Sequence, residues 1–175
     1  MAPPGTFERV YAAIKERLRS GAYKPGERLV EAPRHEGFRT PMMTETTLRH
    51  LYAWHQDLLR LAILNRAAAE GQPEILPEAS ERGVPTHERC NAAFLTLARS
   101  TGNPEHLAAL AALTERMEPV QQIEDALLDA VEEESNEIVA AIGGGDRNRL
   151  RKALLHYHRR RERIVPELIS RLLKP

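Results

Sequence analysis

The chain has 175 residues, enough for one well-developed hydrophobic core or for a small module joined to a helical domain. Its 25 Lys and Arg residues balance 25 Asp and Glu residues, so no overall basic charge indicates a nucleic-acid-binding protein, and its one cysteine excludes a disulfide framework. Because no apolar run reaches the ~18 residues of a membrane span and the N-terminus does not resemble a secretory signal, we expect a cytoplasmic protein without a membrane partner.

The predicted elements are nearly all helices, each recognised by apolar residues at helical spacing and by Gly, Pro or capping residues at its ends. A first helix near residues 7–19 leads to a short extended piece at 28–31. Residues 33–41 are expected to form either a loop or a second short strand around 37–39. Longer helices are then expected at residues 44–70, 86–100, 104–119, 124–142 and 147–172. Pro119 is expected to end or kink its helix, and Pro166 to bend the last one. The pattern predicts an all-α fold, an antiparallel helical bundle.

Charge is segregated along the second half of the chain. Nine acidic residues lie between Glu115 and Glu137, and ten basic residues lie between Arg147 and Lys174. Two segments of opposite sign, both helical by pattern, are typical of neighbouring helices or of a contact between subunits. Two solvated helix faces would give the same pattern.

Several short segments carry a resemblance to a known family. Residues 10–15 (VYAAIK) and 20–31 (SGAYKPGERLVE) closely resemble the start of the winged helix-turn-helix in GntR-family transcriptional regulators. Residues 48–52, 100–104 and 138–146 resemble the helical effector-binding and dimerisation domain of the FadR-type branch. The resemblance implies a winged-helix unit at 1–41, a helical domain at 42–175, a small-molecule effector and a homodimer formed through the helical domain.

The chain departs from the family in its DNA-binding unit. In the family, two further helices follow this opening, and the second lies in the major groove. Here only twelve residues separate Glu31 from the helix that begins near Thr44. We align residues 35–39 with the wing, which leaves out the DNA-reading helices. A second alignment starts a recognition helix at Thr40, with Arg39 and Thr40 as DNA-contacting candidates, but loses the wing. On either alignment we expect DNA binding to be weak or absent.

A metal centre is not expected. Many FadR-type effector domains hold a divalent metal with one aspartate and three histidines. The resemblance places these four positions on residues that differ from the family's ligands: Cys90, Phe94, Ser135 and Tyr157. His156 and His158 flank the last of them. Since such metals need imidazole and carboxylate ligands together, we expect neither a metal nor another cofactor.

The same positions are candidates for an effector pocket. His55 stands where the family often has an arginine that points toward the effector. With His55, the set of Cys90, Phe94, Ser135 and Tyr157 predicts an apolar pocket with few polar groups, suited to a small neutral or amphipathic effector. A filled core is the alternative interpretation of these residues.

No enzymatic motif is present in the sequence. The helices carry no Glu-x-x-His pair for a di-iron centre, no Gly-rich loop follows a strand, and Cys90 lies on an apolar helix face. We therefore expect no catalytic activity. The favoured interpretation is a ligand-responsive GntR/FadR-type regulator homologue with an incomplete DNA-binding unit. The alternative is a non-DNA-binding interaction protein that pairs with itself or with an intact paralogue.

Overall fold

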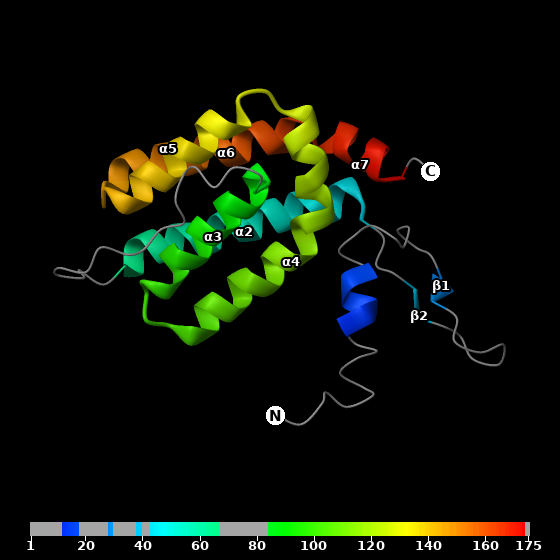
Figure 1. Cartoon of the computed structure of the whole chain (residues 1–175), viewed down its shortest axis with the longest axis horizontal. Helices are drawn as coiled ribbons and strands as arrows, with labels where there is room; N and C mark the ends of the chain where they lie inside the picture. Colours follow the sequence, from blue (N-terminus) through cyan, green and yellow to red (C-terminus); the bar gives the residue numbers. More distant parts are fainter. Residues whose placement is uncertain (1–11, 18–27, 30–37, 40–42, 67–83, 174–175) are drawn as a thin grey trace.

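The computed structural model describes residues 12–17, 28–29, 38–39, 43–66 and 84–173. In this part of the chain the helices form a bundle, which confirms the predicted all-α fold class (Figure 1). The bundle helices are α2 (Glu45–Asn65), α3 (Thr86–Arg99), α4 (Pro104–Leu127), α5 (Val131–Gly143), α6 (Arg147–Arg163) and α7 (Val165–Leu173). Helix α2 contacts α3, α4, α6 and α7, so it forms the centre of the packing. Of the described helices, none is long and apolar enough to cross a membrane.

Two short strands precede the bundle. Strand β1 (Arg28–Leu29) pairs antiparallel with β2 (Phe38–Arg39), which confirms the extended pieces predicted at these positions. The second alignment expects a recognition helix to begin at Thr40, and α2 is not that helix, because α2 begins at Glu45 and Arg39 lies in β2. Thr40 itself and the domain boundary expected between residues 41 and 42 lie outside the described residues.

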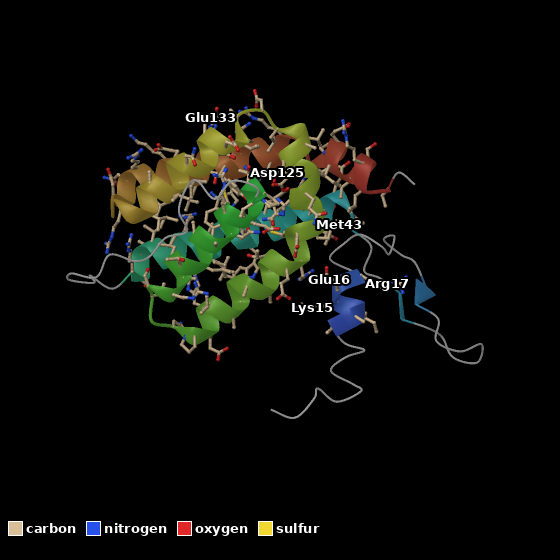
Figure 2. The ribbon with its side chains drawn as sticks, viewed as in Figure 1. Lys15, Glu16, Arg17, Met43, Asp125 and Glu133 are labelled. Carbon is tan, nitrogen blue, oxygen red and sulfur yellow. The ribbon has the colours of Figure 1, made fainter. Side chains whose placement is uncertain are left out.

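The helical residues 12–17 lie beside the bundle (Figure 2). Lys15 in this segment donates a hydrogen bond to Glu115 of α4 at 2.8 Å. Both side chains are well exposed, so this ion pair contributes at most about 1 kcal/mol. The ends predicted for this first helix, like the connection predicted at residues 71–83, lie outside the described residues.

Side-chain caps set the start of three helices at the predicted positions. The Thr44 hydroxyl accepts from the third amide of α2 at 3.1 Å. The Asn103 side chain accepts from two amides of the first turn of α4, and Asp146 accepts from two amides of α6 at 3.0 Å each. Each cap satisfies amides that have no partner within their own helix, which is worth about 1 kcal/mol.

Helix α2 ends earlier than its sequence pattern predicts. The apolar pattern extends the helix to residue 70, but α2 ends at Asn65 and Arg66 has a non-helical ψ of 112°. The Arg66 guanidinium donates to the Ile142 carbonyl at the end of α5, and its own carbonyl accepts from Arg147 at 3.3 Å. These contacts with α5 and α6 stabilise the non-helical backbone at Arg66.

The proline predictions are met in part. Of the two outcomes predicted at Pro119, an end or a kink, the structure shows the second: α4 continues to Leu127 and changes direction along its length (Figure 1). Buried residues on both sides of Pro119 offset the cost of about 3 kcal/mol for an interior proline. The next helix therefore begins at Val131, after Ala130 with a left-handed φ of 48°, and not at residue 124. At the C-terminus, α6 ends at Arg163, and α7 is a separate helix that holds Pro166 in its first turn.

Candidate functional site in the bundle interior

The structure brings all five effector-pocket candidates into the bundle interior. His55 comes from α2, Cys90 and Phe94 from α3, Ser135 from α5 and Tyr157 from α6, and none is more than 3% exposed. The His55 and Phe94 rings meet edge to face at a centroid distance of 5.3 Å, and Phe94 and Tyr157 do so at 5.4 Å. The Cys90 thiol lies beside the Ser135 hydroxyl. Residues from four helices thus form one cluster of aromatic rings and small polar groups.

His55 forms a buried pair with His158, and the pair fixes both tautomers. The Nδ1 atom of His158 lies 2.7 Å from the Leu154 carbonyl, which can only accept, so this nitrogen carries the hydrogen. The His158 Nε2 atom then accepts from His55 Nδ1 at 3.0 Å. Burial lowers the pKa of His158 to about 4, and burial together with His158 and Arg161 lowers the pKa of His55 well below its ordinary value. Both rings are therefore neutral near pH 7.

One nitrogen of this pair is left without a partner. The His55 Nε2 atom is buried and makes no hydrogen bond within the described residues. Because His55 Nδ1 carries the hydrogen, Nε2 presents an unused lone pair. The Ser135 hydroxyl is a second buried group without a hydrogen bond of normal geometry in this part of the structure. Buried polar groups are nearly always satisfied, so two such groups in one cluster require an explanation.

A buried ionic network adjoins the cluster. The Arg161 guanidinium donates to Glu124 through Nε and to Glu134 through Nη1, both at 2.7 Å. The Tyr52 hydroxyl donates to the other Glu124 oxygen, and the guanidinium carbon lies 3.3 Å from the centroid of the Tyr157 ring. Burial would lower the pKa of Arg161, but Tyr157, Glu124 and Glu134 outweigh it and raise the pKa. Arg161 is therefore a permanent cation that already pairs with two carboxylates.

The segregated charges of the sequence pair with each other inside the chain. Besides Arg161, Arg160 lies 3.2 Å from Glu134 and 2.7 Å from Asp129. Arg149 contacts Glu137 at 2.6 Å on the surface. The prediction of neighbouring helices is confirmed, whereas the interpretation as two solvated faces is wrong at Arg161, which is only 4% exposed. The separation of acidic and basic residues along the sequence indicated that these helices pair, but it could not identify which arginine is buried.

Two further polar pairs join α3 to α4. The Asn91 and Gln121 amides exchange hydrogen bonds at 2.8 and 3.2 Å. The Asp125 carboxylate accepts from the His87 backbone amide at 3.2 Å and from its Nδ1 atom at 2.7 Å. Burial opposes protonation of His87, but the hydrogen bond to Asp125 outweighs it and raises its pKa. Both pairs hold the start of α3 against the second half of α4.

The interior residues do not fit a divalent metal. Burial raises the pKa of Cys90 to about 11, so the thiol keeps its proton at neutral pH and is a poor ligand and a poor nucleophile. A phenylalanine ring at position 94 cannot coordinate. Within the described residues, no group of three or more His, Cys, Asp or Glu side chains is placed to hold a metal ion.

Comparison with known proteins identifies the fold. A solved structure of E. coli McbR/YncC is similar to this chain, with a TM-score of 0.60 and 19% sequence identity over 91% of this chain and 96% of that chain. At this identity the similarity shows the fold alone. Comparisons with protein-family models and with curated proteins find no match.

Proposed function

We propose that this chain is a GntR/FadR-type regulator homologue whose bundle binds a small effector at the His55, Cys90, Phe94, Ser135 and Tyr157 cluster. The unpaired acceptor at His55 Nε2 is the observation that carries the proposal. A buried group left unsatisfied costs about 1–3 kcal/mol, and a ligand that donates a hydrogen bond to it would recover that cost. Binding sites of this kind combine aromatic walls with a few polar groups that fix the orientation of the ligand.

The electrostatics favour a neutral or amphipathic effector over a carboxylate. The buried cation beside the cluster, Arg161, already serves Glu124 and Glu134. A carboxylate ligand would be a third anion beside this one guanidinium, which would leave a buried charge without compensation. A hydroxyl, amide or indole N–H can instead donate to His55 and pack its apolar part against Phe94.

A thermal-shift experiment tests the effector site. Indole, 1-octanol and octanamide are neutral probes with one donor group and an apolar body, and octanoate is the matched anion. A ligand at one hundred times its dissociation constant adds about 2.7 kcal/mol, which raises Tm by about 5–10 °C in a protein of this size. The increase should disappear in His55→Leu and persist in His50→Leu, an exposed histidine of the same helix. Equal shifts in both variants, or a larger shift with octanoate than with 1-octanol, contradict the proposal.

For DNA, the proposal is weak binding without sequence preference. Strand β2 is followed closely by α2, whose inner face is buried in the bundle and cannot lie in a major groove. The measurement is fluorescence anisotropy at physiological salt, comparing the duplex upstream of the chain's own gene with a scrambled duplex. We expect equal dissociation constants of about 10⁻⁴ to 10⁻⁶ M. A thousandfold preference for the upstream duplex would show that an intact DNA-binding unit is present.

A second function, self-association without DNA binding, is favoured by the outer face of α2. Trp54, Leu61 and Leu64 are 50%, 43% and 57% exposed and lie on one side of this helix. Such a stripe can pair with its own copy across a two-fold axis, as in most homodimers. We expect a dimer in sedimentation equilibrium that dissociates in Leu61→Glu but not in Leu173→Glu, a change at an exposed leucine of α7. A wild-type monomer at micromolar concentration contradicts the dimer. Sedimentation equilibrium of this chain mixed with an intact paralogue tests whether the two proteins form a heterodimer.

A further inference from the structure

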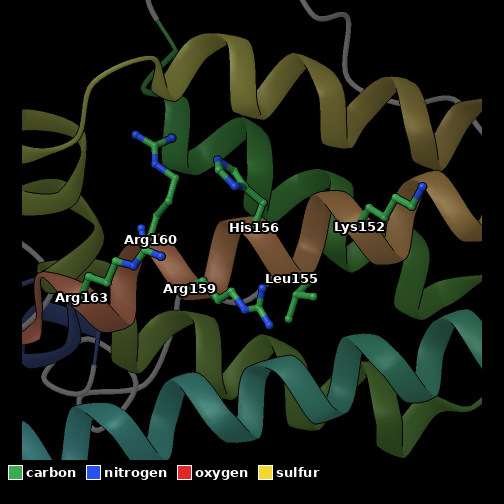
Figure 3. A pocket seen from close by; sticks show the side chains of 6 residues that line it. All are labelled: Lys152, Leu155, His156, Arg159, Arg160 and Arg163. Atoms are coloured by element: carbon green, nitrogen blue, oxygen red, sulfur yellow. The ribbon is translucent and has the colours of Figure 1, made fainter.

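The exposed side of α6 carries a basic groove that the effector site does not use. Its volume is about 220 Å³, and it lies on the surface of the bundle (Figure 3). The residues that line it come from one helix, and five of the six are lysine, arginine or histidine: Lys152, Leu155, His156, Arg159, Arg160 and Arg163.

Among the described residues, most of these basic side chains are not paired with acids. Arg160 is committed to Asp129 and Glu134 and forms one wall of the groove. In the part of the chain that the structure describes, no carboxylate forms an ion pair with Lys152, His156, Arg159 or Arg163: Glu162 shares the helix but pairs with none of them. The groove therefore combines concave shape with uncompensated positive charge.

The spacing of the charges defines two subsites. Lys152 and His156 are four residues apart, as are Arg159 and Arg163, which places the members of each pair about 6 Å apart on one face. The two pairs are displaced by seven residues, or about 10 Å along the helix. Leu155, 39% exposed, lies between them and offers an apolar contact. A single small anion cannot reach both pairs, but an extended anion can.

We propose that this groove binds a small extended ligand that carries several phosphoryl groups. Arginine forks match phosphate oxygens in bidentate geometry, and Lys152 adds a point charge at the other end. The acidic segment of a second copy is a poorer occupant, because Glu124, Asp129, Glu134 and Glu137 are engaged by arginines of their own chain. The proposal is independent of the effector site, which lies inside the bundle.

The test is equilibrium dialysis of the full chain against tripolyphosphate at low and physiological salt. We compare the wild type with Arg159→Gln/Arg163→Gln and with a matched control, Arg151→Gln, an exposed arginine of the same helix outside the groove. Exposed charge pairs contribute about 0.2–1 kcal/mol each, so losing two should weaken binding by about two- to thirtyfold. The control should stay within about twofold of wild type, and wild-type binding should weaken with salt.

Each alternative gives a distinct result. If tripolyphosphate does not bind the wild type, or binds the double variant and the control equally, the proposal is wrong. A short random duplex is dialysed in parallel: if the double variant loses duplex binding while tripolyphosphate never binds, the groove is a nucleic-acid surface instead. If the double variant changes the sedimentation coefficient, the groove is a subunit contact. Arg159 and Arg163 are exposed, so the double variant should melt at the same temperature as the wild type. Melting curves that coincide exclude misfolding as the cause of weaker binding.

Discussion

Replacing Arg161 by methionine should destabilise the bundle severely. The guanidinium neutralises Glu124 and Glu134, which are buried beside it with side chains 1% and 6% exposed. Arg161→Met removes this cation, so Glu124 keeps only the Tyr52 hydroxyl on one oxygen. Among the described side chains, Glu134 keeps only Arg160, which lies 3.2 Å away. The methionine side chain fills much of the same volume, so the main effect is electrostatic.

The expected loss is large relative to the stability of a domain. Removing one partner of a buried ion pair costs about 3–5 kcal/mol, mostly because the other charge is left uncompensated. The free energy of unfolding of a typical domain is about 5–15 kcal/mol. With an m-value of about 2 kcal/mol/M, the urea midpoint should fall by about 1.5–2.5 M.

Urea unfolding followed by circular dichroism at pH 7 measures this loss. The control is Arg159→Met on the exposed side of the same helix, which should change the free energy of unfolding by no more than about 0.5 kcal/mol. A triple variant, Glu124→Gln/Glu134→Gln/Arg161→Met, removes all three charges and should recover most of the loss.

Two results would refute the reasoning. If Arg161→Met costs less than about 1 kcal/mol, the two carboxylates are not desolvated as the structure implies. If the triple variant is no more stable than the single one, the loss comes from packing and not from uncompensated charge.

Three further predictions concern the helix start and the interior. The pKa values of His55 and His158 are lower in the folded chain than in the unfolded chain, so the unfolded chain binds protons first on acidification. The urea midpoint should therefore decrease as the pH is lowered from 6.5 to about 4. His158 alone contributes about 3 kcal/mol to this loss at 1.36 kcal/mol per pH unit, and His158→Leu should flatten the curve. Asp146→Ala removes the cap of α6 and should lower Tm by about 2–4 °C in calorimetry. Ser135→Ala removes an unsatisfied hydroxyl, so its urea midpoint should equal or exceed that of wild type.

Local sequence signals determined most helices and their buried faces. The apolar spacing of residues 48–63 identified the inner face of α2, including His55, because a helix that packs against others must bury one side. Thr44 and Asp146 marked helix starts because their side chains bond to amides within the next three residues. The resemblance placed five residues from four helices at one site, and the structure brings them together.

Tertiary packing decided what these signals could not. A proline costs the same wherever it stands in a helix interior, but α4 continues through Pro119 because buried residues flank it, while the last helix divides near Pro166. The charge pattern could not distinguish Arg161 from its neighbours Arg160 and Arg159. Its burial depends on Glu124 and Glu134, which lie 37 and 27 residues away along the chain. Charges so far apart in sequence come into contact only when the helices pack, because neither carboxylate is close enough to act on the arginine in the unfolded chain.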